Sequence, residues 1–494
     1  MKHRIMNDWQ KKQMLTFGGL LLGFQLVFFL FVTLLKTSNI RSYLMVAPVS
    51  FLIGGALLFL TVRLQGDAVL PFLFAVLLSL GTALQGSLSN LAPVKTIIIY
   101  LIGLMAMTFV AWADEYYKRK ILRRYANKIL FGLCCLHFGL LLFLLFFGKE
   151  FNNTRAWIRL PGFYFQATEL LKLIFPCLIC CLFGADQRKD RTKLLLGTLI
   201  MGATALLMLV IGELGTLLVL GIVYLIVLFL TIRSTKLAIA YIIGILFCVL
   251  ILACVLYILH LLLAGSSSSL AIAIERPIRR WNLFLHPEID PSDNVQMIEA
   301  QRAVLVGGLL GSRSNNYIIN QGTDMIFPYL ILRLGILSGF VVLTAYLLFF
   351  FRTQRALRNE PDPYTYLLCT TLSTTLMIQT LVISFGSLNF IPLTGIPLPL
   401  LSEGGASMIV NFALFGLLFK HSCSRQALKH CRQTLKRVRQ HPCPEKKQPV
   451  PQETEPQQRT VFVPQSRTKT DTPDQEPAQT PPAEPQSTSS SETD

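Results

Sequence analysis

Long apolar stretches separated by short polar connections are the feature that most constrains how this chain can fold. The first stretch runs from Leu15 to Leu35, close to the ~20 residues that an α-helix needs to cross a bilayer. Inside a membrane, only helices and closed barrels satisfy all of their backbone hydrogen bonds. Because the stretches have helix length, we expect an all-α fold, a polytopic transmembrane helical bundle.

The composition agrees with a membrane-embedded chain. Of the 494 residues, 53% are hydrophobic and 15% are charged, whereas a soluble globular domain carries roughly 25% charged residues. Residues 1–14 are basic, and the apolar run that follows is too long for a signal-peptide core and has no small-residue cleavage site. We therefore interpret residues 1–14 as a cytoplasmic N-terminus and the run as the first span.

Hydropathy windows of about 19 residues predict roughly twelve spans. They lie near Leu15–Leu35, Leu44–Val62, Val69–Leu84, Thr96–Ala113, Ile129–Phe147, Leu170–Phe183, Leu194–Val210, Leu214–Ile232, Leu237–Leu263, Phe327–Phe351, Tyr366–Phe385 and Ser407–Phe419. We divide them into N-terminal helices, residues 15–128, and a transmembrane core, residues 129–420. Residues 421–494 begin basic and become rich in Pro, Gln, Thr and Glu, a composition that predicts a disordered tail.

Lys and Arg gather in alternate connections, at residues 118–124, 188–193 and 352–358. With twelve spans, these connections lie on the same side as both termini, and the positive-inside rule makes that side cytoplasmic. We expect a multi-pass protein of the cytoplasmic (inner) membrane. The net charge of +18 follows this topology bias and suits anionic membrane lipids, so we expect no nucleic-acid partner.

Two longer segments lie on the opposite side of the expected bundle. One is the connection from Gly148 to Ala167, and the other is a large extracellular loop, residues 264–326. Loops of that length are uncommon unless they are functional. All 11 cysteines fall in spans or in the tail, and the C-x-x-C spacing at Cys177–Cys180 has no nearby histidine, so we expect apolar packing and no metal site.

The first of these segments leads into a span through several chemically suggestive residues. Trp157 suits a membrane interface, and the guanidinium of Arg155 could hold a phosphate. Glu169 and Lys172, three residues apart on one helix face, are costly in a membrane unless they are paired. They bind substrate or form a structural ion pair at the head of the helix.

Glu213 stands between two apolar runs, in Gly212-Glu213-Leu214-Gly215-Thr216. A carboxylate inside a membrane is a functional candidate, whereas a carboxylate in a turn at the surface carries little cost. The sequence leaves both interpretations open.

The large loop combines arginines with one carboxylate at the mouth of a span. Arg279 and Arg280 could hold the pyrophosphate of an anionic lipid-linked substrate, and Gln296 follows as a further candidate contact. Asp324 could take a proton from an attacking hydroxyl. The alternative for Asp324 is an N-cap of the next helix.

The last constellation runs from Leu393 to Ser407, where two prolines and two adjacent glycines interrupt an apolar region. Irregular backbone at membrane depth is tolerated only where protein buries it or where it lines a cavity. Glu403 in this break needs a partner, and we predict an ion pair with Arg333.

These segments, from Asn152 to Phe419, resemble in order the motifs of the SEDS family, to which FtsW, RodA and SpoVE belong. The family's N-G-A-R-R-W-I…F-S-F-Q-P-S-E-L-x-K, P-D-[LF]-G-T, R-x-x-x-F-L-[DH]-P…Q…G-G-L-x-G, T-D-F-I-F and T-G-I-P-L-P-x-x-S-Y-G-G-[SA]-S are each largely matched. The matching residues include Asn152, Arg155, Trp157, Gln166, Glu169, Lys172, Gly215, Thr216, Arg280, Gln296, Gly307, Thr323, Asp324, Gly395 and Ser402. The T-G-I-P-L-P wording is nearer to RodA.

The resemblance implies a glycosyltransferase that polymerises lipid II into glycan strands outside the cytoplasmic membrane, for cell shape, elongation or division, with a class B penicillin-binding protein as partner. Asp324 would be the catalytic carboxylate that activates the acceptor sugar 4-hydroxyl. Arg155, Arg279 and Arg280 would hold the donor pyrophosphate. No resident cofactor is implied, although Mg²⁺ or Mn²⁺ could accompany the lipid pyrophosphate.

The chain departs from the family pattern at three charged positions. Glu213 replaces an Asp, Arg333 stands where a Glu pair is usual, and Glu403 replaces a Tyr. The family also has about ten spans, so about two N-terminal helices are additional. Two alternatives therefore accompany the polymerase. One is an inactive scaffold that binds lipid II and the penicillin-binding protein, and the other is a flippase for lipid-linked precursors.

Overall fold

The computed structural model describes most of the chain. The described residues are 8–34, 40–88, 92–116, 124–151, 154–160, 163–185, 188–232, 235–263, 269–286, 291–314, 317–358 and 360–440. Residues Met1–Arg439 group into one compact unit. The predicted disordered segment of the tail, residues 441–494, lies outside the described residues.

Within the described residues, eleven helical segments are long and apolar enough to cross a membrane. They are α1 (Asp8–Leu34), α2 (Ile40–Arg63), α3 (Val69–Ser87), α4 (Pro93–Tyr116), α6 (Ala126–Phe147), α7 (Leu171–Cys180) with the turns η1 (Ala167–Leu170) and η2 (Cys181–Ala185), α8 (Asp190–Ile211), α9 (Leu214–Thr231), α10 (Thr235–Leu262), α14 (Ile336–Leu357) and α15 (Pro363–Ser387). The twelfth expected span falls in the first part of α16 (Gly405–Gln440), which is not among the eleven. The predicted polytopic helical membrane bundle is confirmed.

The helices differ in how much of their surface the bundle covers. The most hydrophobic 18-residue window of α15 is 83% buried and that of α3 is 78% buried, whereas the window of α10 is 0% buried. α15 is rich in threonine, and the hydroxyls of Thr371, Thr374 and Thr375 donate to backbone carbonyls four residues earlier. Because these donors are satisfied inside their own helix, a polar helix can occupy the centre of the bundle.

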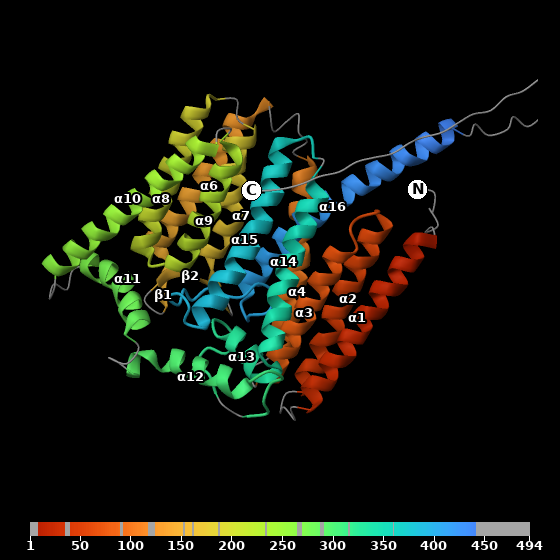
Figure 1. Ribbon diagram of the computed structural model, residues 1–494, viewed down its shortest axis with the longest axis horizontal. Coiled ribbons are helices and arrows are strands. Elements are labelled where there is room, and N and C mark those ends of the chain that lie inside the picture. The colour runs from red at the N-terminus through yellow and green to blue at the C-terminus, as the bar shows by residue number, and fades with distance from the viewer. Residues whose placement is uncertain are drawn as a thin grey trace, which may run out of the picture. The chain divides into compact units, whose positions relative to one another are not determined.

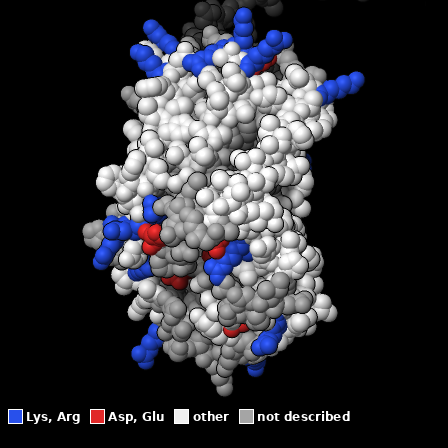
Figure 2. Space-filling view, turned by 90° about the vertical axis from the view of Figure 1, so that its left-hand side faces the viewer, with Lys and Arg blue, Asp and Glu red and all other residues white. Residues whose placement is uncertain are grey.

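The distribution of charge agrees with a bundle embedded in a membrane. Figure 2 shows a broad band of uncharged surface that separates Lys and Arg side chains at one end from mixed charges nearer the other end. In Figure 1 the strands and helices α11 to α13 gather at the lower end, where the mixed charges lie.

A small sheet, which was not predicted from the sequence, occupies the connection from Gly148 to Ala167. β1 (Lys149–Phe151), β2 (Thr154–Leu160) and β3 (Phe163–Gln166) form an antiparallel sheet in the order β1-β2-β3. Trp157 pairs with Gln166, and Arg159 pairs with Tyr164. Since side chains alternate along a strand, Trp157, Tyr164 and Gln166 share one face of the sheet.

The large loop contains α11 (Ser269–Leu285), α12 (Pro291–Gly307) and α13 (Ile326–Leu334). The single span predicted over Phe327–Phe351 is wrong, because α13 and α14 are separate helices that meet at Gly335. Gly335 has a φ of +82°, which favours glycine. The N–H of Ile336 donates to the carbonyl of Gly308 at 2.9 Å, so the end of the loop is hydrogen-bonded into the break.

The connection between α15 and α16 passes through the bundle as irregular backbone, as the sequence predicted. Gln379 of α15 donates to the carbonyl of Pro397 at 2.6 Å, and the Tyr346 hydroxyl of α14 donates to the carbonyl of Pro399. The hydroxyl of Ser402 accepts from the N–H of Leu398 at 2.8 Å. Side chains thus replace the hydrogen bonds that a helix would have made.

Candidate functional site

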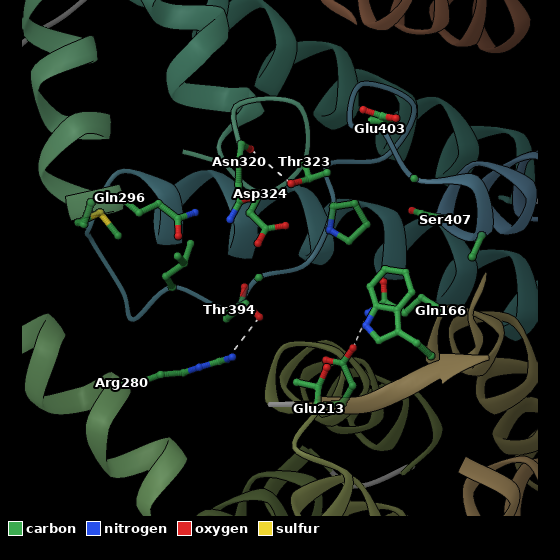
Figure 3. Close-up of a pocket in the computed structure, with 18 of the residues that line it drawn as sticks. Gln166, Glu213, Arg280, Gln296, Asn320, Thr323, Asp324, Thr394, Glu403 and Ser407 are labelled. Carbon is green, nitrogen blue, oxygen red and sulfur yellow. Dashed lines mark hydrogen bonds between the residues drawn. The ribbon is translucent and has the colours of Figure 1, made fainter. Parts of the chain in front are cut away.

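A cavity of about 540 Å³ opens at the end of the bundle that holds the sheet and the large loop (Figure 3). It is enclosed by β2 and β3, α11, α12, the turn before α13, and the α15–α16 connection with the start of α16. Its lining is Thr154, Trp157, Tyr164, Gln166, Glu213, Arg280, Leu283, Phe284, Asn294, Gln296, Met297, Asn320, Thr323, Asp324, Asn389, Leu393, Thr394, Gly395, Pro397, Glu403, Gly404, Gly405, Ala406 and Ser407.

The structure brings six of the ten predicted site residues to this cavity. They are Trp157, Glu213, Arg280, Gln296, Asp324 and Glu403. The other four, Arg155, Glu169, Lys172 and Arg279, are not among its lining residues. Segments more than 200 residues apart in the sequence therefore converge on one site.

Asp324 lies at the end of a tight turn just before α13. The N–H groups of Thr323 and Met325 both donate to the carbonyl of Asn320, at 3.0 and 3.1 Å, and these bonds fix the turn. The N-cap of α13 is Met325, and no side chain caps the helix. The alternative interpretation of Asp324 as an N-cap is therefore wrong.

The Asp324 carboxylate makes no hydrogen bond or ion pair with any described residue, although protein surrounds it. Burial raises the pKa of Asp324 from 3.8 to about 6, and the nearby positive charge of Arg280 lowers it in part. Around neutral pH this carboxylate is mostly ionised, but it is basic enough to accept a proton.

Arg280 reaches the cavity from α11. Its guanidinium donates to the carbonyl of Thr394 at 3.5 Å, so the α15–α16 connection positions the arginine (Figure 3). Two polar atoms of the lining are buried and have no partner among the described residues, Gln296 Nε2 and Thr394 Oγ1. Since buried polar groups are nearly always hydrogen-bonded, unpaired ones in a cavity indicate atoms that a ligand can satisfy.

Glu213 closes the side of the cavity formed by the α8–α9 turn. Gly212 makes this turn with a φ of +89°, which glycine tolerates. The amide of Gln166 and the hydroxyl of Thr168 both donate to Glu213 Oε1, the latter at 3.1 Å (Figure 3). Burial is the main cause that raises the pKa of Glu213. The residue is thus a buried carboxylate of the cavity and not an exposed turn residue.

Two of the predicted site residues that do not line the cavity, Glu169 and Lys172, satisfy each other. Lys172 Nζ lies 2.6 Å from Glu169 Oε1, and both side chains are 1% exposed. An unpaired charge at this depth would cost several kcal/mol, which explains the pairing. The structure therefore shows the ion pair that was the alternative to substrate binding.

Arg155 and Arg279 are not among the residues that line the cavity. The guanidinium of Arg155 is 3.8 Å from the carboxylate of Glu150, in a pair that is about half exposed. Arg279 is an exposed residue of α11. Their predicted role in holding a pyrophosphate remains a prediction.

The predicted ion pair between Arg333 and Glu403 is wrong. Arg333 donates to the carbonyl of Ser314 at 2.9 Å and lies over the Tyr329 ring, with the guanidinium carbon 5.3 Å from its centroid. The Glu403 side chain is exposed and makes no hydrogen bond or ion pair with any described residue. Arg333 stabilises the end of the large loop, whereas Glu403 belongs to the cavity.

Sequence reasoning did not select several polar residues that line the cavity, including Gln166, Asn320, Thr394 and Ser407. Gln166, Thr394 and Ser407 lie within the sequence motifs described above. Their position close in sequence to the charged residues of those motifs could have identified them. Asn320 carried none, because it reaches the cavity through the fold of the turn. Among the described residues, no group of three or more His, Cys, Asp or Glu side chains could hold a metal ion.

The fold and the site define a polytopic helical membrane protein with a polar, carboxylate-bearing cavity at one end of its bundle. Residues 55–427 match the model of the cell cycle protein family FtsW/RodA/SpoVE. This chain belongs to that family. The match begins inside α2, so α1 and the first part of α2 precede it, and the predicted division at residue 128 remains a prediction.

Two named proteins are similar to this chain in sequence. A probable peptidoglycan glycosyltransferase FtsW of Geobacter sulfurreducens is 28% identical over 312 residues, which are 61% of this chain and 78% of that protein. The stage V sporulation protein E of Bacillus subtilis is 27% identical over 336 residues, 65% of this chain and 84% of that protein.

Two solved structures share the fold. A chain from a peptidoglycan synthase complex that coordinates polymerization and crosslinking is 23% identical, with a TM-score of 0.57 over 73% of this chain and 98% of that chain. A mutant of the rod shape determining protein RodA of Thermus thermophilus is 22% identical, with a TM-score of 0.50 over the same shares.

Proposed function

We propose that this chain is a peptidoglycan glycosyltransferase that polymerises lipid II into glycan strands in the cavity around Asp324. The family membership and the similar proteins named as peptidoglycan glycosyltransferases support this activity. The observation that carries the proposal is the Asp324 carboxylate, which lines the cavity, has no partner among the described residues and has a pKa of about 6.

In the proposed reaction, the 4-hydroxyl oxygen of the acceptor sugar attacks C1 of the donor sugar. A new C1–O glycosidic bond forms as the bond from C1 to the lipid diphosphate breaks. Asp324 accepts the proton of the attacking hydroxyl, and the lipid diphosphate leaves with the bonding electron pair. Each transfer therefore gives one glycosidic bond, one proton on the carboxylate and one released lipid diphosphate.

The leaving diphosphate needs positive charge and hydrogen-bond donors. Arg280 supplies both, since a guanidinium matches the oxygens of a phosphate. Gln296 Nε2 is an additional donor, and Figure 3 shows Gln296 on the same side of the cavity as Arg280. Donors that are already in place when negative charge develops stabilise the transition state most effectively.

The cavity faces the outer side of the cytoplasmic membrane in this proposal. Connections at the opposite end carry basic clusters, such as Arg188, Lys189, Arg191 and Lys193 before or within the start of α8. The positive-inside rule makes that end cytoplasmic and places both termini there.

A divalent cation, Mg²⁺ or Mn²⁺, fits the site only together with the substrate. The described residues offer no three-ligand cluster, but Mg²⁺ commonly binds one or two carboxylates together with substrate phosphates. The substrate diphosphate would supply ligands to such an ion, and the ion would neutralise charge on the leaving group.

The partner in this proposal is a class B penicillin-binding protein that cross-links the strands. A chain with the same fold belongs to a complex in which polymerization and crosslinking are coordinated, which supports a shared assembly. Strands made beside a transpeptidase can be cross-linked as they emerge.

The test is lipid II polymerisation in detergent by the purified protein together with its cognate class B partner. We expect glycan strands from the wild type and a loss of at least ~100-fold for Asp324→Asn, because general-base catalysis contributes about that much. Arg355→Gln, at the opposite end of the bundle, is the control. Equal rates for wild type and Asp324→Asn would disprove the role of Asp324. Lipid II binding without strands would indicate the scaffold, and lipid II transfer across vesicles would indicate the flippase.

A further inference from the structure

From the geometry of the cavity, we infer that Glu403 forms an acceptor subsite that binds a primary ammonium group on the peptide of the substrate. This inference rests on the proposed glycosyl transfer and names the chemistry that one end of the same cavity recognises. It begins from a carboxylate that the protein itself leaves unsatisfied.

The Glu403 backbone is held firmly while its side chain remains free. Its N–H donates to the carbonyl of Gly322 at 2.7 Å, in the turn that carries Asp324. The side chain is exposed at the cavity and has no hydrogen bond or ion pair with any described residue. Because this carboxylate lines the cavity and is not engaged by the described protein, it is available to accept a positively charged group of a ligand.

The loops that carry Glu403 and Asp324 are fastened to each other. Gln85 of α3 donates to the carbonyls of Gly322 and Leu401, at 2.9 and 3.1 Å. The hydroxyl of Ser402 donates to the carbonyl of Thr323 at 2.7 Å. These bonds fix the spacing of the two carboxylates, so a group bound at Glu403 has a defined position relative to the reacting hydroxyl.

Glycine keeps the space around this carboxylate open. A Cβ atom at Gly322 would lie 3.6 Å from Glu403 Oε2, and Gly404 and Gly405 follow Glu403 in the lining. A larger residue at 322 would compete with a ligand for the carboxylate.

The charges of the lining divide the cavity. Its described residues include one cation, Arg280, and three carboxylates, Glu213, Asp324 and Glu403. Glu213 is satisfied by Gln166 and Thr168, and Asp324 lies in the field of Arg280. Of the three carboxylates, Glu403 alone has neither a hydrogen-bond donor among the described residues nor the field of Arg280. It would therefore repel an anionic substrate unless that substrate offers a positive group there.

Figure 3 shows that Arg280 and Glu403 approach the cavity from opposite sides, with Asp324 between them. In the proposed reaction the diphosphate departs from the side of Arg280, and the hydroxyl that Asp324 deprotonates belongs to the acceptor. The Glu403 side is therefore the acceptor side. We therefore assign the ammonium group to a basic side chain of a peptide that the acceptor carries.

The experiment compares lipid II whose stem peptide carries a lysine with the same lipid II acetylated on that lysine. Binding to the full-length protein in detergent is measured first, and polymerisation with the cognate partner second. We expect the wild type to bind the free amine about tenfold more tightly, the effect of ~1.4 kcal/mol for a charge-assisted contact. Glu403→Gln should lose this preference, and Glu403→Asp should retain part of it.

Glu275→Gln is the matched control, because Glu275 is an exposed carboxylate of α11 that does not line the cavity. It should keep the wild-type preference. Thermal unfolding of Glu403→Gln should match the wild type, since its side chain has no partner among the described residues. Equal binding of both lipids by the wild type, or a preference unchanged in Glu403→Gln, would overturn the inference. The binding measurement needs no turnover, so its result is valid even if no glycan strands form. A failure to form strands would count against the proposed function alone.

Discussion

The cavity gathers several polar groups that have no partner among the described residues. Elsewhere, charges at membrane depth satisfy each other, as Glu169 and Lys172 do at 2.6 Å. In the cavity, the Asp324 carboxylate, Gln296 Nε2 and Thr394 Oγ1 have no partner among the described residues. A protein tolerates such atoms where a substrate satisfies them, because leaving them unpaired costs stability.

The raised pKa of Asp324 gives a testable dependence on pH. A general base acts in its ionised form, so the rate is full above the pKa and falls as the pH drops through it. With a pKa of about 6, the polymerisation rate should fall roughly tenfold for each pH unit below that value. The pH profile of kcat/KM for lipid II measures this, because kcat/KM reports the pKa of the protein without substrate.

A matched profile for Glu275→Gln serves as the control, because Glu275 is an exposed carboxylate of α11 outside the cavity. It should superimpose on the wild-type profile. A rate that stays constant down to the ordinary carboxyl pKa of 3.8 would mean that Asp324 is not the titrating base.

At the scale of elements, the large loop is joined to the bundle at the break between α13 and α14. The N–H of Ser312 donates to the carbonyl of Leu332 at 2.8 Å, and the N–H of Ile336 donates to Gly308. These two hydrogen bonds replace bonds that the backbone of a continuous helix would have made within itself. The break turns α13, and with it the Asp324 turn, toward the cavity.

Gly335→Ala should destabilise this junction. Its φ of +82° with a ψ of 168° is a conformation almost confined to glycine and costs an L-residue about 1–3 kcal/mol, and a Cβ there would collide with the carbonyl of Leu309. We expect a lower thermal unfolding midpoint in detergent together with weaker polymerisation, since the junction holds the Asp324 turn. Gly55→Ala is the control, because a Cβ at Gly55 meets nothing within 4 Å. Equal midpoints for the two variants would contradict this account of the break.

At the scale of the whole molecule, charge is distributed along the axis of the bundle. Basic residues crowd one end, and mixed charges with the cavity occupy the other, with an uncharged band between them (Figure 2). This asymmetry orients a membrane protein, because cytoplasmic connections retain Lys and Arg. In the orientation that we propose, the cavity faces the side where cell-wall polymer accumulates.

The orientation can be tested with green fluorescent protein fused after Gln440. The fusion should fluoresce, because this reporter matures in the cytoplasm and fails when it is exported unfolded. A fusion truncated after His286, past α11, should remain dark, since that position lies on the cavity side. A dark fusion at Gln440 beside a bright one at His286 would reverse the assigned topology.

The sequence by itself determined the polytopic helical bundle, the basic end and all four charged residues of the described cavity lining. These properties are local, because span length, hydropathy and motif spacing are each read within one stretch of chain. Asp324, Arg280 and Glu403 could be selected this way because charged residues at membrane depth or beside a span are unusual.

Only the tertiary structure decided which residues have partners. The sequence predicted that Arg333 pairs with Glu403, but the turn before α13 and the break at Gly335 direct Arg333 to Ser314 and leave Glu403 free. The sheet that presents Trp157 and Gln166 depends on pairing between strands, which no local pattern revealed. Partner choice is a three-dimensional property, since a side chain bonds to whatever the packing of distant segments brings within about 3 Å.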